Sequence, residues 1–207
     1  MARAYSKIAF TPTVRALQAR YGSAQAYEKF LAPETPPNDA LGEAEISFIR
    51  EREGFYQATV SETGWPYLQY RGGLKGFVHA LDARTLAYAD FRGNRQYLSV
   101  GNLANNDRIA LFFMDYANRR RLKLFGNVRL VDLDDDPALI RSLHNPGYHA
   151  KPERAFLINV AGFDWNCPQH ITERYTRDEI ESAVAPLRDE LQRLQMENEE
   201  LKRKLGA

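Results

Sequence analysis

The chain has 207 residues, of which 44% are apolar, and its 28 basic and 27 acidic residues leave a formal net charge of +1. This length supports one well-buried domain with an extension rather than two full domains. The balanced charge argues against nucleic acid or an anionic membrane as a partner of the whole chain, so any charge-driven binding must be local. No apolar run approaches the roughly 20 residues that span a bilayer, and the N-terminal residues do not resemble a secretory signal. The single cysteine, Cys167, fits a reducing compartment, so we expect a cytoplasmic protein.

Residues 1–50 predict a helical segment. Apolar side chains between Thr13 and Leu31 recur at helical spacing, with a break near Gly22, and the pattern stops before Pro33. Residues 44–52 predict one more short helix, which precedes a change of pattern at Phe55.

Residues 51–175 predict a mainly β domain with peripheral helices. The extended segments are 55–61, 66–71, 76–81, 85–89, 109–115, 121–130 and 155–160, and Gly64 marks a hairpin between the first two. In the segment 121–130 the residues alternate, so Arg121 and Lys123 face away from the core. Asp136 followed by Pro137 marks the start of a helix. About six strands at short spacing indicate a closed or nearly closed barrel.

Residues 87–103 form the most informative stretch of the chain. An apolar strand runs into a polar loop that contains Arg92 and Arg95, and a short amphipathic segment follows. Two guanidiniums offer forked donors to a dianion, Gly93 allows close approach of the backbone, and the amides of a following helical turn point the same way. The loop therefore predicts a phosphorylated ligand. A solvated arginine-rich turn is the alternative.

Residues 176–207 predict a C-terminal helix that forms a coiled coil. Thr176 and Glu179 fit a capping box, and the residues that follow alternate by four and three: Ile180, Val184, Leu187, Leu191, Leu194, Asn198, Leu201 and Leu205. A helix that packs back on its own barrel is the alternative. A DNA-binding leucine zipper is excluded, because the residues before the seam are acidic or mixed rather than basic.

The sequence contains none of the common dinucleotide, phosphate-loop, zinc-protease or serine-hydrolase signatures. Cys167 and His170 form half of a zinc motif without a matching second pair, so we predict no metal site. No side chain stands out as a catalytic acid or base.

The segments from Phe55 to Val131 resemble the split barrels that bind flavin mononucleotide (FMN) and are related to pyridoxamine 5'-phosphate oxidase, in particular a subgroup of predicted flavin-nucleotide-binding proteins. The resemblance is carried by residues 64–73, 76–78, 90–97, 101–103, 115–116, 120–126 and 166–171, and it extends to about Tyr175. It implies a six-stranded split β-barrel that binds FMN, with helices at both ends of the chain.

The resemblance also implies the cofactor site. Carried over by position, Arg71, Arg95 and Arg121 hold the flavin and its phosphate, and Asp90 lies at the flavin while Asn94 shapes the phosphate loop. Gly72, Lys75 and Lys123 complete the candidate cofactor-binding residues. In the family, the residue on the later strand comes from the neighbouring subunit, so a homodimer with FMN at the interface is expected.

The implied function is an oxidoreductase that uses FMN and acts on an unknown small substrate, with a nicotinamide nucleotide or a small organic molecule as donor. The basic C-terminal stretch with which the oxidase recognises pyridoxamine phosphate has no match after Trp165. Oxidation of vitamin B6 is therefore not the leading prediction. A protein that binds flavin, deazaflavin or haem without turnover, or that senses redox state, is the alternative.

Overall fold

The computed structural model describes residues 3–165 and 168–206 and divides the chain into two compact units. The first unit contains the described residues up to Asp115 and those from Arg120 to Pro168. The second contains residues 116–119 and the described residues from Gln169 onward. The predicted domain limits at residues 50 and 175 remain predictions.

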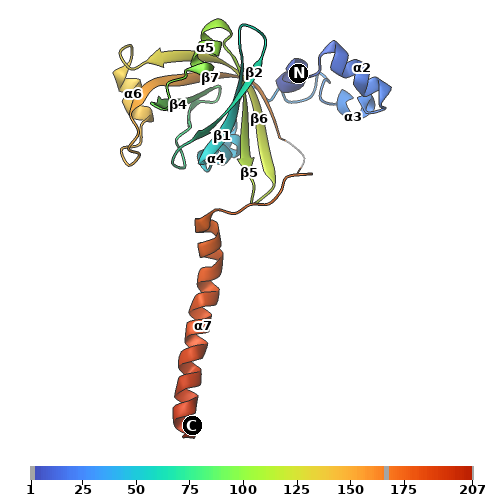
Figure 1. The fold of residues 1–207 in the computed structure, drawn as a ribbon. Coiled ribbons are helices and arrows are strands. Elements are labelled where there is room, and N and C mark those ends of the chain that lie inside the picture. Colours follow the sequence, from blue (N-terminus) through green and yellow to red (C-terminus); the bar gives the residue numbers. More distant parts are fainter. Residues whose placement is uncertain (1–2, 166–167, 207) are drawn as a thin grey trace. The chain divides into compact units, whose positions relative to one another are not determined.

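The first unit is built on one antiparallel sheet (Figure 1). Its strands follow one another in the order β2-β1-β5-β6-β7-β4-β3, so β2 and β3 are the two edges and the sheet is not a closed barrel. The mainly β fold with an incompletely closed sheet confirms the predicted class. The sheet has seven strands rather than six, because each of the seven extended segments predicted from the sequence forms one. The strands are β1 (Gly54–Val60), β2 (Pro66–Gly72), β3 (His79–Asp82), β4 (Thr85–Phe91), β5 (Arg108–Asp115), β6 (Arg120–Asp132) and β7 (Pro152–Trp165).

An aromatic core fills the inner side of the sheet. Phe55 on β1 packs against the rings of Phe113 and Tyr88, with ring centroids 5.0 and 5.3 Å apart, and Phe156 stacks on Tyr88 at 4.8 Å. The buried hydroxyl of Tyr88 donates a hydrogen bond to Gln57 Oε1 at 2.6 Å, which satisfies this polar group inside the core. Strict alternation on β1 and β5 produces this arrangement, because every second side chain points inward.

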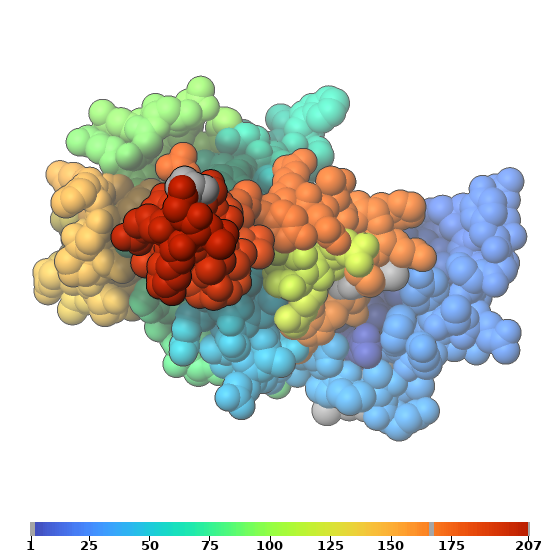
Figure 2. Space-filling model, turned by 90° about the horizontal axis from the view of Figure 1, so that it is seen from below, coloured from blue at the N-terminus to red at the C-terminus, as the bar shows by residue number. Residues whose placement is uncertain are grey.

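The first unit also contains six helices among its described residues. The short helix α1 packs against β7 at Gly162, where a Cβ atom would lie 2.5 Å from the backbone nitrogen of Tyr5. Figure 2 shows the N-terminal helices in blue at one end of this unit and the segment around α6 in yellow at the other. The break predicted near Gly22 is confirmed, since it separates α2 from α3. The six are α1 (Ala4–Ala9), α2 (Pro12–Arg20), α3 (Ala24–Glu28), α4 (Glu43–Arg50), α5 (Leu98–Asn105) and α6 (Pro137–Leu143).

A glycine at the bulge of β6 provides a test of the sheet packing. At Gly126 a Cβ atom would lie 2.7 Å from the backbone oxygen of Asn159 and 2.7 Å from a methyl group of Ile158. We expect Gly126→Ala to lower the free energy of unfolding by about 1–3 kcal/mol, because the added methyl group overpacks the β6–β7 ladder. Urea unfolding followed by circular dichroism measures the change. Gly101→Ala is the matched control, since nothing lies within 4 Å of its Cβ position in α5, and an equal loss there would contradict the explanation.

The second unit is dominated by α7 (Arg177–Leu205), which is one continuous helix (Figure 1). The predicted capping box is confirmed: Thr176 Oγ1 accepts the Glu179 N–H at 3.2 Å, and the Glu179 carboxylate accepts the Thr176 N–H at 2.7 Å. Among the described residues, no helix is both long enough and apolar enough to span a membrane.

Candidate functional site: an arginine groove at the open side of the sheet

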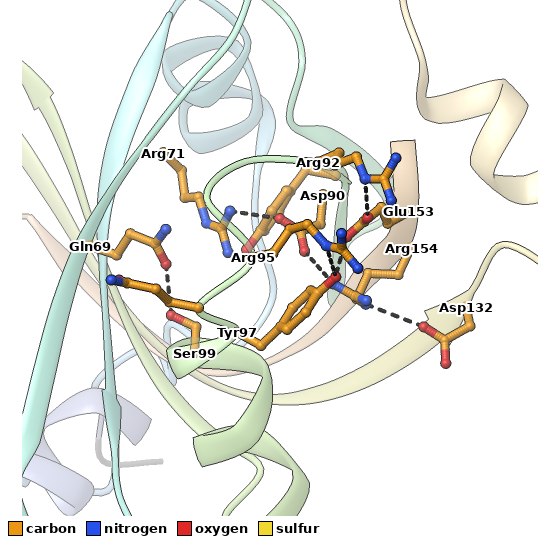
Figure 3. A network of polar contacts seen from close by, with 12 residues as sticks. Gln69, Arg71, Asp90, Arg92, Arg95, Tyr97, Ser99, Asp132, Glu153 and Arg154 are labelled. Atoms are coloured by element: carbon orange, nitrogen blue, oxygen red, sulfur yellow. Dashed lines mark hydrogen bonds and ion pairs between the residues drawn. The ribbon is translucent and has the colours of Figure 1, made fainter. Parts of the chain in front are cut away.

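A polar groove lies where β2, β4, the start of β7 and the loop before α5 meet (Figure 3). We call it the arginine groove, and its cavity measures about 70 Å³. Three guanidiniums and two carboxylates are among the groups that line it, so cations outnumber anions. The lining residues are Tyr67, Gln69, Arg71, Asp90, Phe91, Gly93, Asn94, Arg95, Gln96, Tyr97, Leu98, Ser99, Val100, Glu153 and Arg154.

The buried carboxylate of Asp90 joins two arginines at the base of the groove. Arg71 Nη1 lies 2.6 Å from Asp90 Oδ1, and Arg154 Nη1 lies 2.9 Å from Asp90 Oδ2 (Figure 3). Arg154 also bonds Asp132 through its Nε at 3.2 Å. Four strands separate β2 from β4 in the sheet order, so the Arg71–Asp90 contact shows that the sheet curls until its edge strand reaches the other side.

Arg71 keeps one donor unused. Its Nε is buried and has no hydrogen-bond partner among the described residues, while its guanidinium lies 5.4 Å from the centroid of the Phe156 ring. Buried polar groups in folded proteins are nearly always paired. The Nε therefore leaves Arg71 short of one acceptor near the base of the groove.

The loop that follows β4 holds its side chains in a defined, strained conformation. Arg95 and Tyr97 both adopt the left-handed backbone region, with φ of 62° and 53°. The Arg95 Nε donates to the Tyr97 hydroxyl at 3.4 Å, and this bond raises the pKa of Arg95. Asn94 Oδ1 accepts the Gln96 N–H at 3.1 Å, which closes the turn. The loop thus presents an exposed cation on a shaped backbone.

The first turn of α5 also faces the groove. Backbone N–H groups at a helix start have no partner inside the helix and carry a partial positive charge, and residues 98–100 line the groove. Ser99 Oγ donates to Gln69 Oε1 at 2.8 Å, which fixes this turn against β2. The helix start and the guanidiniums together form an environment suited to an anion.

The structure brings together four of the eight predicted cofactor residues, namely Arg71, Asp90, Asn94 and Arg95. Gly72 ends β2 next to Arg71, but it is not among the lining residues. Lys75 is exposed on the loop after β2 and lies outside the groove.

The two predicted cations on β6 also lie outside the groove of their own chain. Lys123 Nζ is 2.9 Å from Asp164 and 4.8 Å from the centroid of the Tyr5 ring. Arg121 lies over the ring of Phe112 at 4.7 Å, and its buried Nε has no hydrogen-bond partner among the described residues. Cys167, which was half of the weak metal motif, falls outside the described residues.

Sequence reasoning missed several residues of the groove. Arg154 directly precedes the predicted strand 155–160 and was not among the predicted site residues, whereas β7 begins at Pro152 and includes it. Gln69 could have been found, because it shares a strand face with Arg71 two residues later. Nothing in the sequence pointed to the left-handed conformation of Tyr97.

A second cavity of about 240 Å³ lies beside the groove, and Phe91 lines both. Aromatic rings and two imidazoles surround it. Burial lowers the pKa of His79, and His144 Nε2 lies 2.9 Å from the carbonyl oxygen of Tyr148. Its lining residues are Gly73, Leu74, Gly76, Phe77, His79, Phe91, Ser142, Leu143, His144, Asn145, Pro146 and Tyr148.

Comparison with solved structures finds the same fold elsewhere. HupZ of Group A Streptococcus is 15% identical with a TM-score of 0.50, and the match covers 65% of this chain and 99% of that one. A variant of HupZ is also 15% identical with a TM-score of 0.50, over 61% and 99% of the two chains. An FMN-binding protein from Syntrophomonas wolfei is 9% identical with a TM-score of 0.42, over 75% and 97%, and this weaker likeness carries no argument. At these identities the matches show the fold alone.

None of the curated proteins compared with the chain matches it. The family model described as pyridoxamine 5'-phosphate oxidase matches residues 41–159, which include β1 to β6, the first part of β7 and every residue that lines the arginine groove. This match spans more than half of the chain. The chain therefore belongs to the pyridoxamine 5'-phosphate oxidase family.

Proposed function

We propose that the protein is a flavoprotein that binds FMN in the arginine groove and acts as an oxidoreductase on a small substrate. The observation that carries this proposal is the groove itself, where fixed arginines, a helix start and an unused buried donor converge. Family membership supports the flavin, and the donor set fits the dianionic phosphate of FMN. When bound, FMN supplies the redox chemistry, and the protein binds and orients it.

Each predicted residue has a distinct part in this proposal. Arg71 and Arg95 bind the phosphate, Arg71 from the base of the groove and Arg95 from its exposed loop. Asn94 shapes that loop through its bond to the Gln96 N–H. Asp90 orients Arg71, and Gly72 follows Arg71 at the end of β2. Arg154, which the sequence did not reveal, holds the other side of Asp90.

We also propose that a second copy of the chain completes the site. Ligand pockets usually enclose about 300–1,000 Å³, and the groove of one chain encloses only about 70 Å³. Residues from outside this chain must therefore contact FMN to enclose it. Arg121, Lys75 and Lys123 lie away from their own groove, so a second copy is the source that would bring them to the flavin. Lys123 is the weakest of the three, because Asp164 already neutralises it.

The outer face of the sheet supports this homodimer. Cross-strand partners share a face, and the pairs Tyr56–Tyr70 and Tyr56–Phe112 extend an apolar stripe from β2 across β1 to β5. Leu68 is 64% exposed and Tyr70 is 54% exposed on that face. Arg121 over Phe112 marks the end of the stripe. Exposed apolar patches of this kind mark interaction surfaces, and the placement of Arg121 on it links the surface to the flavin site.

The second cavity is our candidate for the substrate. It adjoins the arginine groove at Phe91, and its aromatic walls and two imidazoles suit a small planar molecule with hydrogen-bonding groups. The lowered pKa of His79 keeps this imidazole neutral near pH 7. No catalytic acid or base is assigned.

Flavin binding and turnover are tested separately. Arg95→Ala is expected to weaken FMN binding by about 10- to 100-fold, because a charge-assisted bond to the phosphate is lost. Fluorescence quenching of FMN during titration measures the dissociation constant. Arg84→Ala is the control, since this exposed arginine pairs with Asp39 away from the groove. Equal affinities of wild type and Arg95→Ala would contradict the placement of the phosphate.

Turnover is read from the absorbance of the loaded protein mixed with NADH or NADPH without oxygen. Bleaching of the flavin band supports the oxidoreductase. A flavin band that stays unchanged with every donor supports a binding or sensing protein, and a Soret band in the purified protein supports haem.

A further inference from the structure

Helix α7 exposes an apolar stripe along its whole length. None of its residues, all of which the structure describes, is buried. Leu187 is 71% exposed, Leu191 is 57% exposed and Leu205 is 81% exposed, and the stripe also contains Ile180, Val184, Leu194 and Leu201. Most of the stability of helices in proteins comes from packing of the apolar face. A 29-residue helix with an open apolar face therefore requires a partner.

We propose that α7 pairs with α7 of a second copy of this chain as a parallel, two-stranded coiled coil in register. The helix repeats in heptads with apolar residues at a and d. The a positions are Val184, Leu191, Asn198 and Leu205, and the d positions are Ile180, Leu187, Leu194 and Leu201. Leucine at three successive d positions, with β-branched Val184 at a, favours two strands over three or four.

Asn198 selects both the direction and the register. In a parallel pair in register, an a residue faces the same a residue of the partner, so two Asn198 amides meet and bond each other. In an antiparallel pair an a residue faces a d residue, which would place the amide against leucine and leave it unpaired. An unsatisfied buried polar group costs about 1–3 kcal/mol. The parallel arrangement in register therefore avoids a penalty that antiparallel and out-of-register pairs pay.

The flanking charges agree with this direction. Glu197 occupies a g position and Lys202 the e position five residues later, and in parallel coils these positions face each other across the interface. Within one helix, Glu197 pairs with Arg193, whose guanidinium lies 3.3 Å away at an outward c position. In the coiled coil, Lys202 of the second helix would approach the same Glu197 carboxylate, and this contact would occur on each side of the interface.

Pro186 does not interrupt the seam. It also occupies a c position, so its ring points away from the partner, although it removes one backbone donor from the first turns of α7. The a and d residues from Leu187 to Leu205 all follow Pro186 in the sequence. A coil of this length is marginal by itself, and a second interface between the same two copies would raise its effective concentration. The inference shares a homodimer with the proposed function, but it rests on α7 alone and not on FMN.

Disulfide trapping tests the inference in the full-length chain. The variants carry Cys167→Ser and one new cysteine, either Leu201→Cys at a d position or Gln192→Cys at an outward b position. In a buffer of oxidised and reduced glutathione, we expect the d-position thiols to form an interchain disulfide at an equilibrium ratio at least tenfold above that of the b-position thiols. An antiparallel pair centred on α7 would hold the d-position thiols about 30 Å apart, because each helical residue advances about 1.5 Å.

Equal or absent cross-linking at the two positions would overturn the proposal. A charge exchange provides a second, independent readout: Glu197→Lys is expected to lower the cross-linking of Leu201→Cys, and adding Lys202→Glu is expected to restore it. The two positions are five apart and do not contact each other within one helix, so restoration requires the partner. FMN titration of the same samples separates this inference from the proposed function, since loss of the coil with unchanged FMN affinity contradicts only the inference.

Discussion

Arg71→Ala is expected to weaken FMN binding by about a hundredfold or more, which is the largest effect on affinity of any single change in the arginine groove. A charge-assisted hydrogen bond contributes about 1.5–3 kcal/mol, and each 1.4 kcal/mol corresponds to a tenfold change in the dissociation constant. The loss is increased by Asp90, because removal of Arg71 leaves this buried carboxylate less neutralised beside the phosphate. Titration with fluorescence detection measures the affinity, and circular dichroism confirms that the variant is folded.

Two variants control this experiment. Arg71→Lys keeps the charge but loses the planar fork that contacts Asp90 and the ligand together, so its affinity is expected to fall between the wild type and Arg71→Ala. Arg129→Ala removes an exposed arginine from β6, away from the groove, and leaves the affinity unchanged. If folded Arg71→Ala bound FMN as tightly as the wild type, the phosphate would not lie at the base of the groove.

Asp90→Ala is expected to cause the largest loss of stability, about 3 kcal/mol in the free energy of unfolding. Removing one member of a buried ionic cluster typically costs about 3–5 kcal/mol, since the remaining charges stay buried without a partner. We expect the lower end of that range, because the side chains of Arg71 and Arg154 are 17% and 13% exposed and water can reach them. Urea unfolding, with the slope checked for two-state behaviour, measures the difference.

A double variant separates loss of the ion pair from loss of packing. Replacing both partners with apolar residues, as Arg71→Met with Asp90→Leu, removes the buried pair, while Arg154 keeps its contact with Asp132. The double variant is expected to recover more than half of the lost stability. If Asp90→Ala alone lowered the free energy of unfolding by less than about 1 kcal/mol, the carboxylate would be solvated rather than held in ion pairs with Arg71 and Arg154.

Local signals in the sequence were sufficient for most of the fold. Extended segments bounded by turn signals located the seven strands. The capping residues Asp136 and Thr176 marked the starts of α6 and α7, where both side chains accept backbone N–H groups. Helix α1 had no such signal. It depends on Gly162, a distant glycine that lets its backbone approach β7, and a contact of that kind leaves no periodic trace in the chain.

From the pattern of the residues alone, the arginine groove was predictable only where it is local, and Arg71 and Asp90 were named through the family resemblance. Asn94 and Arg95 sit on one loop, so the pattern of the chain pointed to them directly. Arg71 and Asp90 meet because the whole sheet curls, and Arg154 joins them from a strand 64 residues away from Asp90. Curvature of a sheet depends on the packing of all its strands at once, and single-strand patterns do not record it.

The left-handed backbone at Arg95 and Tyr97 lowers the stability of the fold while it shapes the loop that is proposed to bind the cofactor. A side chain in the left-handed region costs about 1–2 kcal/mol relative to glycine, and here two such residues stand almost side by side. Selection of a library for thermal tolerance alone would therefore enrich glycine or asparagine at both positions. The survivors would withstand heating better and, under the proposed function, would retain less FMN during purification.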